Sequence, residues 1–411
     1  MRSVVLVWLL PGLAACSGDS RDTAGGEEPL VSLEVEAGGH DRQDCLLRWP
    51  LPPDRLPVRL IETTDGRAIP VPSQYDPASG ELVWMAPGEF LQGTTRSFAI
   101  LPGEDRSRSA GLVRDPDGRA LELQVRGEKV LRYNCAPVSP PDPSMPASLA
   151  RAAYIHPVWA PSGKVVTDDF HPDHAHQRGI WMAWTETRLE GRTPDFWNLP
   201  EGTGVVRLAG IQRILEGPVF AGVDARHEHV DLSAPGGELP VLEEQFEIRA
   251  YVLGGKKAGF FLMDVRSRQR NVAAGPLELP EYHYGGFGVR GARSWTPDIL
   301  SVRTSAGKDR ASADGSREHW ILMEGPLGDG NPAGIAVFGH PENFRSPQPV
   351  RMHPEMQYFS FSPQRLGGFE IAPGSTLVSQ YRVLVYDGSA PESTLQAFWW
   401  DYAEPPAVRA R

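Results

Sequence analysis

LEEQFEIRAYVL (residues 242–253) and AGFFLMDVRSRQR (residues 258–270) are the segments that best define the fold, and Gly254-Gly255-Lys256-Lys257 separates them. Apolar and polar side chains alternate in both segments, which is typical of strands with one buried face. A short connection that begins with two glycines suits a tight turn. The stretch therefore predicts an antiparallel β-hairpin.

Segments of the same kind lie on both sides of this hairpin. VSLEVEA and PVRLIETTDG precede it, and GIAVFGH, MQYFSFS and STLVSQYRVLVYDG follow it. The 43 glycines and 39 prolines suit many short strands joined by many turns. The best helical segment, ESTLQAFWWDYAE (residues 392–404), is short. We therefore predict an all-β chain, a large antiparallel β-sandwich preceded by a small β-sandwich module.

The chain of 411 residues is long enough for two or three domains. We predict a small β-rich module at residues 29–136 and a larger β-sandwich at residues 152–405. The Pro-rich residues 137–151 between them form either a linker or an extended loop laid across the second domain. Cys45 and Cys135 bracket the small module. In an exported protein this pair predicts a disulfide bond, with two separate buried thiols as the alternative.

The amino terminus, MRSVVLVWLLPGLAACSGDS, has one arginine, a short apolar run and small residues before Cys16. This order predicts a secretory signal at residues 1–16. Leu-Ala-Ala-Cys is the pattern of the bacterial lipobox and predicts lipidation of Cys16; the alternative is an ordinary signal peptide. Residues 17–28 predict a flexible tether. We expect an exported protein that faces the periplasm or the cell surface, held at the outer membrane by its lipid alone.

Charge and missing motifs narrow the function. A formal net charge of −11 argues against nucleic acid as a partner. No segment after the signal reaches the roughly 20 apolar residues that a membrane-spanning helix needs. The chain has no GxSxG, Walker, HExxH or CxxC motif. Serine hydrolases, nucleotide triphosphatases and standard zinc proteases therefore lose their usual support.

Polar groups are densest in DDFHPDHAHQRGIWMAW (residues 168–184). If HAH is extended, His174 and His176 point to one face, because strand side chains repeat every two residues. Both imidazoles could then act on one substrate, or bind one divalent metal ion as its ligands. Asp173 is predicted to orient them and Arg178 to clamp the substrate. The alternative is a hydrogen-bonded polar loop with structural histidines.

Two other motifs supply candidate partners. Glu281 and His283, in EYHYGGFGVR, are two residues apart and are predicted to act as acid–base groups opposite the histidines. Asp195 and Trp197, in RTPDFWN, predict sugar binding, because aromatic faces stack on sugar rings while a carboxylate binds hydroxyls. The alternative for RTPDFWN is core packing, with Asp195 capping a turn.

The Pro-rich segment GHPENFRSPQPVRMHPEMQYFSFSP (residues 339–363) is predicted to be a loop that carries binding residues. Its three candidates for substrate binding are His340, Arg345 and His353. A second HxH pair, His227 and His229, lies in the strand-like ARHEHVDL, and we expect a structural role for it.

Residues 152–198, from AAYIHPVWAPSGK to TPDFWN, closely resemble the core signature of the bacterial PmoA-like proteins, which are uncharacterised exported proteins. YGGFGVR and GHPENFRSPQPVRMHP also match, so the resemblance covers roughly residues 130–402. Where that family reads Asp-His-Pro-His-His-Arg-Gly, Ala175 and Gln177 replace the proline and the last histidine. A chemistry that needs only His174 and His176 would survive this difference, and one that needs the third imidazole would not.

The family label implies a subunit of particulate methane monooxygenase. That subunit has several transmembrane helices, so methane oxygenase activity is not expected here. The family is similar to the galactose-mutarotase-like supersandwiches, which implies histidines and a carboxylate that act on a sugar from a concave sheet.

We therefore predict an exported enzyme that acts on a carbohydrate or sugar derivative by histidine and carboxylate acid–base chemistry, as an isomerase, lyase or hydrolase. The alternative is a non-catalytic glycan-binding lipoprotein. A third reading is a copper or other transition-metal protein built on the two HxH pairs.

Overall fold

The computed structural model describes residues 27–199, 201–254, 257 and 259–411. The predicted signal, Cys16 and residues 17–26 of the predicted tether lie outside these residues. Strands dominate the described chain, whose one α-helix is α1 (Glu392–Ala403). None of its helices is long and apolar enough to cross a membrane. The predicted all-β fold and the predicted short helix are confirmed.

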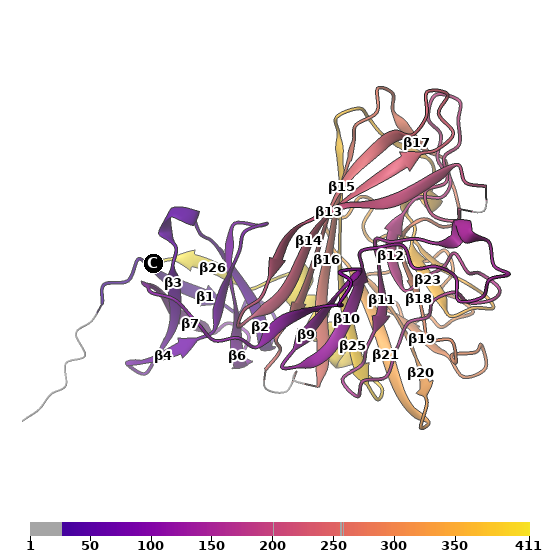
Figure 1. The fold of residues 1–411 in the computed structure, drawn as a ribbon. Coiled ribbons are helices and arrows are strands. Elements are labelled where there is room, and N and C mark those ends of the chain that lie inside the picture. The colour runs from indigo at the N-terminus through magenta and orange to yellow at the C-terminus, as the bar shows by residue number, and fades with distance from the viewer. Residues whose placement is uncertain (1–26, 200, 255–256, 258) are drawn as a thin grey trace, which may run out of the picture.

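Two eight-stranded antiparallel sheets form the large β-sandwich (Figure 1). The first, the long sheet, has the order β13-β14-β15-β16-β25-β21-β20-β19. Its strands are β13 (Gly204–Leu215), β14 (Phe220–Asp231), β15 (Leu239–Tyr251), β16 (Phe260–Asn271), β25 (Thr376–Asp387), β21 (Asn331–Gly339), β20 (Trp320–Leu327) and β19 (Ser301–Thr304).

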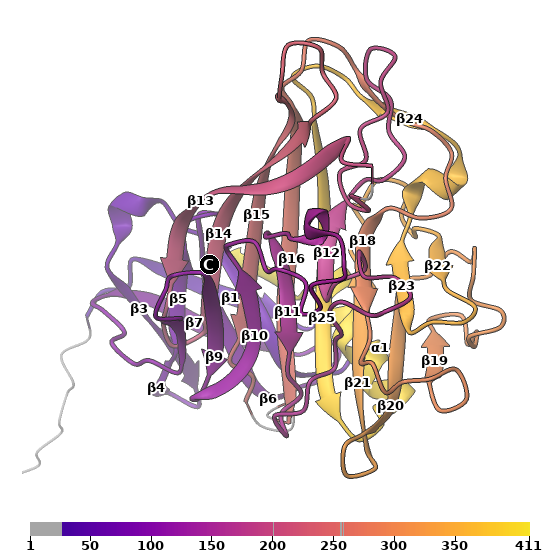
Figure 2. The same ribbon diagram turned by 45° about the vertical axis from the view of Figure 1, so that its right-hand side comes forward.

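The second sheet has the order β22-β23-β18-β12-β11-β10-β9-β8. We call it the loop-covered sheet, because loops lie on its outer face. Its strands are β22 (Val350–Met352), β23 (Tyr358–Phe361), β18 (Gly286–Arg290), β12 (Ile180–Ala183), β11 (Tyr154–Val158), β10 (Glu128–Asn134), β9 (Ala120–Val125) and β8 (Ala110–Arg114). A short pair, β17 (Leu277–Leu279) and β24 (Phe369–Ile371), lies at one end of the sandwich (Figure 2).

The predicted hairpin is present, because β15 and β16 pair antiparallel in the middle of the long sheet. Phe246, Ile248 and Ala250 point into the sandwich interior. Tyr251 and Leu253 join a separate apolar cluster that packs around α1. Because side chains alternate along a strand, the two faces of the long sheet pack on different apolar cores.

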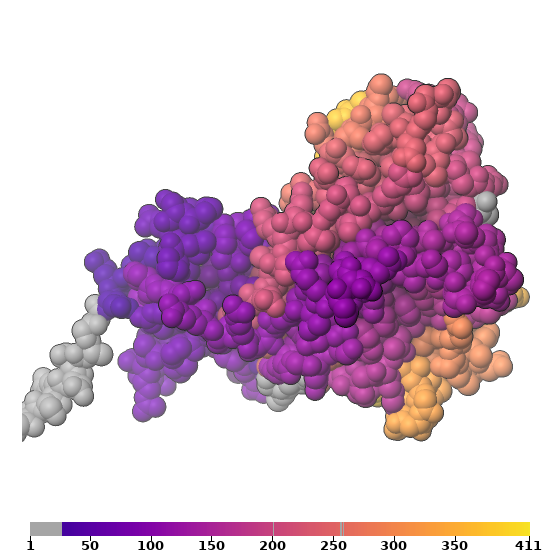
Figure 3. Space-filling view, in the orientation of Figure 1, coloured from indigo at the N-terminus to yellow at the C-terminus, as the bar shows by residue number. Residues whose placement is uncertain are grey.

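A second, smaller sandwich forms a lobe beside the large one (Figures 1 and 3). Its five-stranded sheet has the order β26-β1-β7-β3-β4, and its three-stranded sheet the order β2-β6-β5. The strands are β1 (Val31–Glu36), β2 (Arg42–Pro50), β3 (Val58–Thr64), β4 (Arg67–Val71), β5 (Ser73–Asp76), β6 (Glu81–Phe90), β7 (Thr95–Pro102) and β26 (Ala407–Ala410). We call this lobe the small module.

The predicted domain boundaries need correction. β8, β9 and β10 lie within the predicted module of residues 29–136, but they pair into the loop-covered sheet. The last strand, β26, returns to the small module and pairs with β1. The small module therefore comprises residues up to about β7 together with the carboxyl-terminal strand, because sheet membership depends on partners far away in the sequence.

The Pro-rich residues 137–151 form the extended loop that was one of the two predicted alternatives. Val138 forms an isolated β-bridge with Arg151, and the carbonyl of Leu149 accepts a hydrogen bond from Arg178 at 3.1 Å. The segment is thus attached to the loop-covered sheet and does not separate two domains.

The predicted disulfide between Cys45 and Cys135 is wrong, since both thiols are free. Cys45 lies in β2, inside the core of the small module, whereas Cys135 follows β10 and packs against the core of the large sandwich. Burial raises the pKa of the Cys45 thiol to about 12 and that of Cys135 to about 11. Two separate thiols, the predicted alternative, are what the structure shows.

Candidate functional site

The loop-covered sheet turns one face into the sandwich and the other outward. Ile180, Val289 and Phe359 pair in register on the inner face and are buried there. Side chains alternate along a strand, so the neighbours of these residues point outward. Trp181 and Arg290 are two such neighbours, and both are buried although they face away from the interior. The loops on the outer face therefore enclose polar and aromatic groups.

The histidine-rich segment is one of these loops and connects β11 to β12. The amide of Gly179 donates to the carbonyl of Asp168 at 2.8 Å, which closes the loop. A Cβ at Gly179 would lie 2.0 Å from the carbonyl oxygen of Ile155, and φ there is +52°, so only glycine fits. Within the loop, His176 lies in a turn and His174 lies between two turns, so HAH is not extended.

Three imidazoles nevertheless meet on the outer face. The ring centroid of His174 lies 5.4 Å from that of His176 and 5.7 Å from that of His353. His353 follows β22 at the end of the Pro-rich loop, and all three side chains are partly exposed. The structure thus brings together two residues of the histidine-rich segment and one of the predicted binding loop. We call these three residues the histidine cluster.

Burial lowers the pKa of every ring in the histidine cluster. The pKa of His176 falls to about 3, first through burial and then through the charge of Arg151 and the neighbouring groups. The pKa of His353 falls to about 4, mainly through burial, and that of His174 is lowered in the same way. All three rings are therefore neutral at pH 7 and can accept a proton. The Nδ1 of His174 is buried with no hydrogen-bond partner among the described residues.

An aromatic layer lies on the same face of the sheet. Trp181 stacks between Trp197 and Tyr358, at centroid distances of 5.0 and 5.6 Å and interplanar angles of 4° and 6°. A Cβ at Gly288 would lie 2.6 Å from the Trp181 indole, so this glycine leaves room for the ring. The guanidinium of Arg151 lies 3.9 Å from the centre of the Trp197 ring. The layer is rigid and offers little exposed ring surface.

Two buried arginines lie near the histidine cluster. Arg290 donates from Nη1 to Gln177 Oε1 at 2.7 Å and lies 3.1 Å from the sulfur of Met356. Arg151 donates from Nη2 to the carbonyl of Trp197. In the described chain, the Nε and Nη2 of Arg290 and the Nε and Nη1 of Arg151 have no hydrogen-bond partner, and neither arginine forms an ion pair.

Arg178 does not face this site, so its predicted role as a substrate clamp is wrong. It is fully buried and ion-paired with Asp169, to which Nη2 donates at 2.8 Å. Its Nη1 donates to the carbonyl of Leu149 at 3.1 Å, and its guanidinium packs 3.6 Å from the ring centre of Phe170. Arg178 therefore fastens the histidine-rich loop to the Pro-rich residues 137–151.

Three further predicted site residues are exposed. Asp173 contacts His171, whose Nδ1 accepts the Asp173 amide at 3.3 Å, so it does not hold the rings of the histidine cluster. Glu281 and His283 are both on the surface, and the His283 ring packs 5.0 Å from that of Tyr284. No hydrogen bond or ring contact joins Glu281 or His283 to the histidine cluster within the described residues.

Three predicted binding residues hold loops in place instead. Asp195 Oδ1 accepts the amides of Trp197 and Asn198, both at 2.8 Å, which is the predicted alternative of a turn cap. Trp197 is 1% exposed, so it offers no face to a sugar. Arg345 donates to the carbonyl of Pro363 at 2.7 Å and anchors its own loop. The substrate-binding roles predicted for Asp195, Trp197 and Arg345 are therefore wrong.

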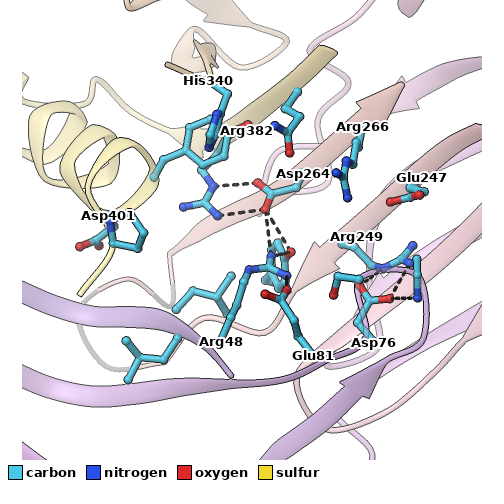
Figure 4. Close-up of a pocket in the computed structure, with 18 of the residues that line it drawn as sticks. Arg48, Asp76, Glu81, Glu247, Arg249, Asp264, Arg266, His340, Arg382 and Asp401 are labelled. Atoms are coloured by element: carbon cyan, nitrogen blue, oxygen red, sulfur yellow. Dashed lines mark hydrogen bonds and ion pairs between the residues drawn. The ribbon is translucent and has the colours of Figure 1, made fainter. Parts of the chain in front are cut away.

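His340 lies apart from the histidine cluster, so its predicted place in the site is wrong too. It lines a cavity of about 750 Å³ between the small module and the long sheet (Figure 4). Several charged groups around this cavity are paired. Arg382 donates to Asp264 at 2.7 Å, and Arg249 donates to Asp76 at 2.8 Å. The pair of Arg249 and Asp76 joins the long sheet to the small module, whereas Arg382 and Asp264 pair within the long sheet.

The second HxH pair lies in the sandwich interior, as a structural role requires. His227 Nδ1 and His229 Nε2 lie 2.8 and 3.1 Å from the same oxygen of Glu244. The hydroxyl of Tyr133 lies 2.5 Å from the other ring nitrogen of His227, and Gln269 donates to Glu244 at 3.2 Å. Burial alone would raise the pKa of Glu244, but the hydrogen bonds from the two histidines outweigh it and hold that pKa below its usual range.

Sequence reasoning missed three groups of the site: Arg290, Arg151 and Tyr358. Arg290 ends the apolar strand FGVR, and Arg151 ends a Pro-rich loop. Each looks like an ordinary surface arginine in the sequence. One feature of the sequence could have identified Arg290. It is a charged residue in a strand whose two faces are otherwise apolar.

In the part of the chain that the structure describes, no group of three or more His, Cys, Asp or Glu side chains is placed to hold a metal ion. The metal site predicted at His174 and His176 stays a prediction.

A model of a family of unknown function, DUF6807, matches residues 120–400. The chain belongs to this family. The matched region runs from β9 to α1 and includes both HxH pairs, while β1 to β8 lie before it. Nothing in this match bears on the resemblance to the PmoA-like proteins, which stays a prediction.

A search of curated proteins found no match. Among solved structures, a glycosyl hydrolase family 38 protein from Enterococcus faecalis is 11% identical with a TM-score of 0.39, covering 92% of this chain and 47% of its own. An alpha-mannosidase from Enterococcus faecalis V583 is 10% identical with a TM-score of 0.40, covering 92% and 46%. A mutant of heparan sulfate lyase HepC from Pedobacter heparinus is 11% identical with a TM-score of 0.29, covering 70% and 37%. The chain spans less than half the length of these three structures, and likeness at this level carries no argument about function.

Proposed function

We propose that this chain is an enzyme that acts on a carbohydrate by acid–base chemistry at the histidine cluster. The observation that carries the proposal is the meeting of three neutral imidazoles, from two separate loops, near the buried guanidinium of Arg290. A neutral imidazole takes a proton at pH 7, and its protonated form returns one. A guanidinium nearby favours negative charge that develops on the substrate.

The arrangement supports distinct roles for the rings. His174 lies between the other two and is partly exposed, so it is placed to meet a substrate first. Its Nδ1 is buried without a partner among the described residues, so neighbouring side chains must move before an incoming group can bind that nitrogen. His176 and His353 are close enough to pass a proton to or from His174 through one water molecule.

An aromatic face at the edge of the site supports a sugar as the substrate. Tyr282 is partly exposed, and its ring lies 5.4 Å from that of Tyr284, which contacts Tyr358 of the aromatic layer at 6.3 Å. Stacking on an exposed ring suits the apolar face of a sugar. Tyr282 therefore takes the role in sugar stacking that was predicted for the buried Trp197.

The test is turnover of a panel of neutral and acidic glycans, with products followed by mass spectrometry and by new reducing ends. We expect one class of glycan to be converted by the wild type, and conversion to be lost in His176→Ala. His319→Ala is the matched control, because His319 is exposed on another part of the surface. Conversion that survives in a folded His176→Ala variant would sink the proposal.

The low pKa of His176 favours a second candidate function, which is glycan binding without turnover. An imidazole with a pKa of about 3 is a weak base. A binding protein would show saturable affinity for a glycan, no product, and gradual losses of affinity across substitutions of His174, Tyr282 and Arg290. An enzyme would lose its rate sharply at one or two of these positions.

We also propose that the chain is exported and lipid-anchored through Cys16. The order of arginine, apolar run and Leu-Ala-Ala-Cys at the amino terminus supports this. Labelled palmitate should enter the wild type and not a Cys16→Ser variant; equal labelling of both would contradict lipidation at Cys16.

A further inference from the structure

Arg290 carries a buried charge that the described residues do not compensate. Its side chain is fully buried, and burial lowers its pKa only to about 10, so it stays charged at pH 7. The two acids that act on it are engaged elsewhere. Asp168 pairs with Arg293 at 3.0 Å, and Asp173 points to solvent beside His171. A buried charge of this kind is costly unless an opposite charge meets it.

The free nitrogens of Arg290 have a definite geometry. Nη1 is occupied by Gln177 and by the sulfur of Met356, while Nε and Nη2 are without partners in the described chain. Nε and Nη2 form the side of a guanidinium that binds a carboxylate through two parallel hydrogen bonds. The free edge is therefore the one suited to a planar group with two oxygens.

Arg151, on the other side of the aromatic layer, is a second buried arginine without a paired acid among the described residues. It is 3% exposed, and burial together with the charge of Arg178 lowers its pKa to about 9. Among the acids, Asp195 has the largest electrostatic effect on Arg151, but its carboxylate already accepts hydrogen bonds from two backbone amides. Two uncompensated arginines around one site indicate that the missing partner is an anion.

We propose that the sugar bound at the histidine cluster carries a carboxylate, and that this carboxylate pairs with the Nε and Nη2 of Arg290. The inference rests on the proposed carbohydrate function, whose substrate class it names as acidic sugars such as uronates. Because Arg290 is fully buried, neighbouring side chains must move for the carboxylate to reach this edge.

The pairing would also change the histidine cluster. The charge of Arg290 is one of the causes that lower the pKa of His174, His176 and His353. A carboxylate on Arg290 offsets this charge, so the pKa values of the rings move back toward the ordinary value. An acidic sugar thereby makes the imidazoles better bases, which a neutral sugar does not do.

The test compares thermal stabilisation by glucuronate, glucose and glucose 6-sulfate in the wild type, Arg290→Met and Arg270→Met. Arg270 is the matched control, because it is an exposed arginine on β16. We expect glucuronate to stabilise the wild type and Arg270→Met, with an affinity about 10- to 100-fold weaker in Arg290→Met. Without ligand, Arg290→Met should melt no lower than the wild type, since it removes an uncompensated buried charge.

The outcomes separate this inference from the proposed function. Equal stabilisation by glucose and glucuronate, unchanged in Arg290→Met, would overturn the carboxylate and leave the carbohydrate function standing. Equal stabilisation by glucose 6-sulfate would overturn the assignment of the anion as a carboxylate. Stabilisation by acetate as strong as that by glucuronate would support the anion site and contradict the sugar.

A second variant covers the case in which Arg290→Met does not fold. Arg290→Lys keeps the charge but loses the two-bond edge, so glucuronate should bind it more weakly than the wild type, by about 10-fold. Wild-type affinity for glucuronate in Arg290→Lys would overturn the proposed pairing.

Discussion

The chain contains two histidine pairs with the same spacing, and their surroundings are opposite. His227 and His229 share one oxygen of Glu244 inside the sandwich, where all three side chains are buried. His174 and His176 lie on the outer face and are partly exposed. Arg290 lowers the pKa of both rings, and on His174 it acts more strongly than Asp173, which raises that pKa. The inner pair is held by a buried counter-charge, whereas among the described residues no carboxylate forms a hydrogen bond or ion pair with the outer pair.

We infer that the charge next to an imidazole distinguishes the inner pair, which is structural, from the outer pair, for which we propose a functional role. The inner pair satisfies a buried carboxylate, so its removal should cost stability. The outer pair satisfies no buried carboxylate among the described residues, so its removal should cost little stability.

Removing the acid of the inner pair should have the largest effect. Glu244→Ala leaves two buried imidazoles without their shared acceptor, and we expect a loss of about 3–5 kcal/mol in the free energy of unfolding. Urea denaturation measures it. Glu243→Ala, an exposed neighbour on the same strand, should change stability by no more than about 0.5 kcal/mol. Similar values for the two variants would show that the inner network is not structural.

Removing one ring of the outer pair should affect rate more than stability. His176→Ala is expected to lower turnover of the converted glycan by about 100-fold or more. Its free energy of unfolding should change by less than about 1 kcal/mol, because the ring carries no ion pair. Steady-state kinetics and urea denaturation on one preparation give both numbers. A large loss of stability with little loss of rate would reverse the assignment.

The two pairs also predict different windows of acid sensitivity. The pKa of His176 is about 3 in the folded chain against an ordinary 6.5, so the unfolded chain takes up this proton first as the pH falls from 6.5, and stability drops. The pKa of Glu244 is held below its ordinary 4.5, so its contribution is complete above pH 4.5 and is lost below it.

A melting curve at each pH separates these windows. Between pH 6.5 and 4.5, His176→Ala should lose less stability than the wild type, because it has removed one group that protonates on unfolding. Between pH 4.5 and about 3 both proteins also lose the contribution of Glu244, and the wild type still loses more. Below about pH 3, where folded His176 is protonated as well, the two proteins should lose stability in parallel. Parallel curves over the whole range would contradict the lowered pKa of His176.

The smallest effect is expected for Asp173, which the sequence placed in the outer site. Its side chain is exposed, and His171 is its one contact among the described residues. Asp173→Asn should change stability by less than about 0.5 kcal/mol and turnover by less than about twofold. A loss as large as that of His176→Ala would restore the predicted orienting role.

Local alternation was enough to predict the hairpin of β15 and β16 and the all-β fold, because the pattern of one strand depends on its two faces. It could not assign β8 to β10 to the loop-covered sheet, or return β26 to the small module. Such assignments depend on partners that are distant in the sequence. β26 and its partner β1, for example, are more than a hundred residues apart. The same limit explains the wrong disulfide.

The site was predicted in part, for a related reason. His174, His176 and His353 were named because polar groups crowd the loops that carry them. Arg178 and Trp197 were mistaken for ligand-binding groups, because only the packing of the Pro-rich residues 137–151 and the aromatic layer buries them.

The most direct test of the central claim compares two double variants, His174→Ala/His176→Ala and His227→Ala/His229→Ala, by melting temperature and by turnover of the same glycan panel. We expect the outer variant to melt like the wild type and to have lost turnover, and the inner variant to melt several degrees lower. An outer variant that melts as early as the inner one, or that still converts the glycan, would contradict it.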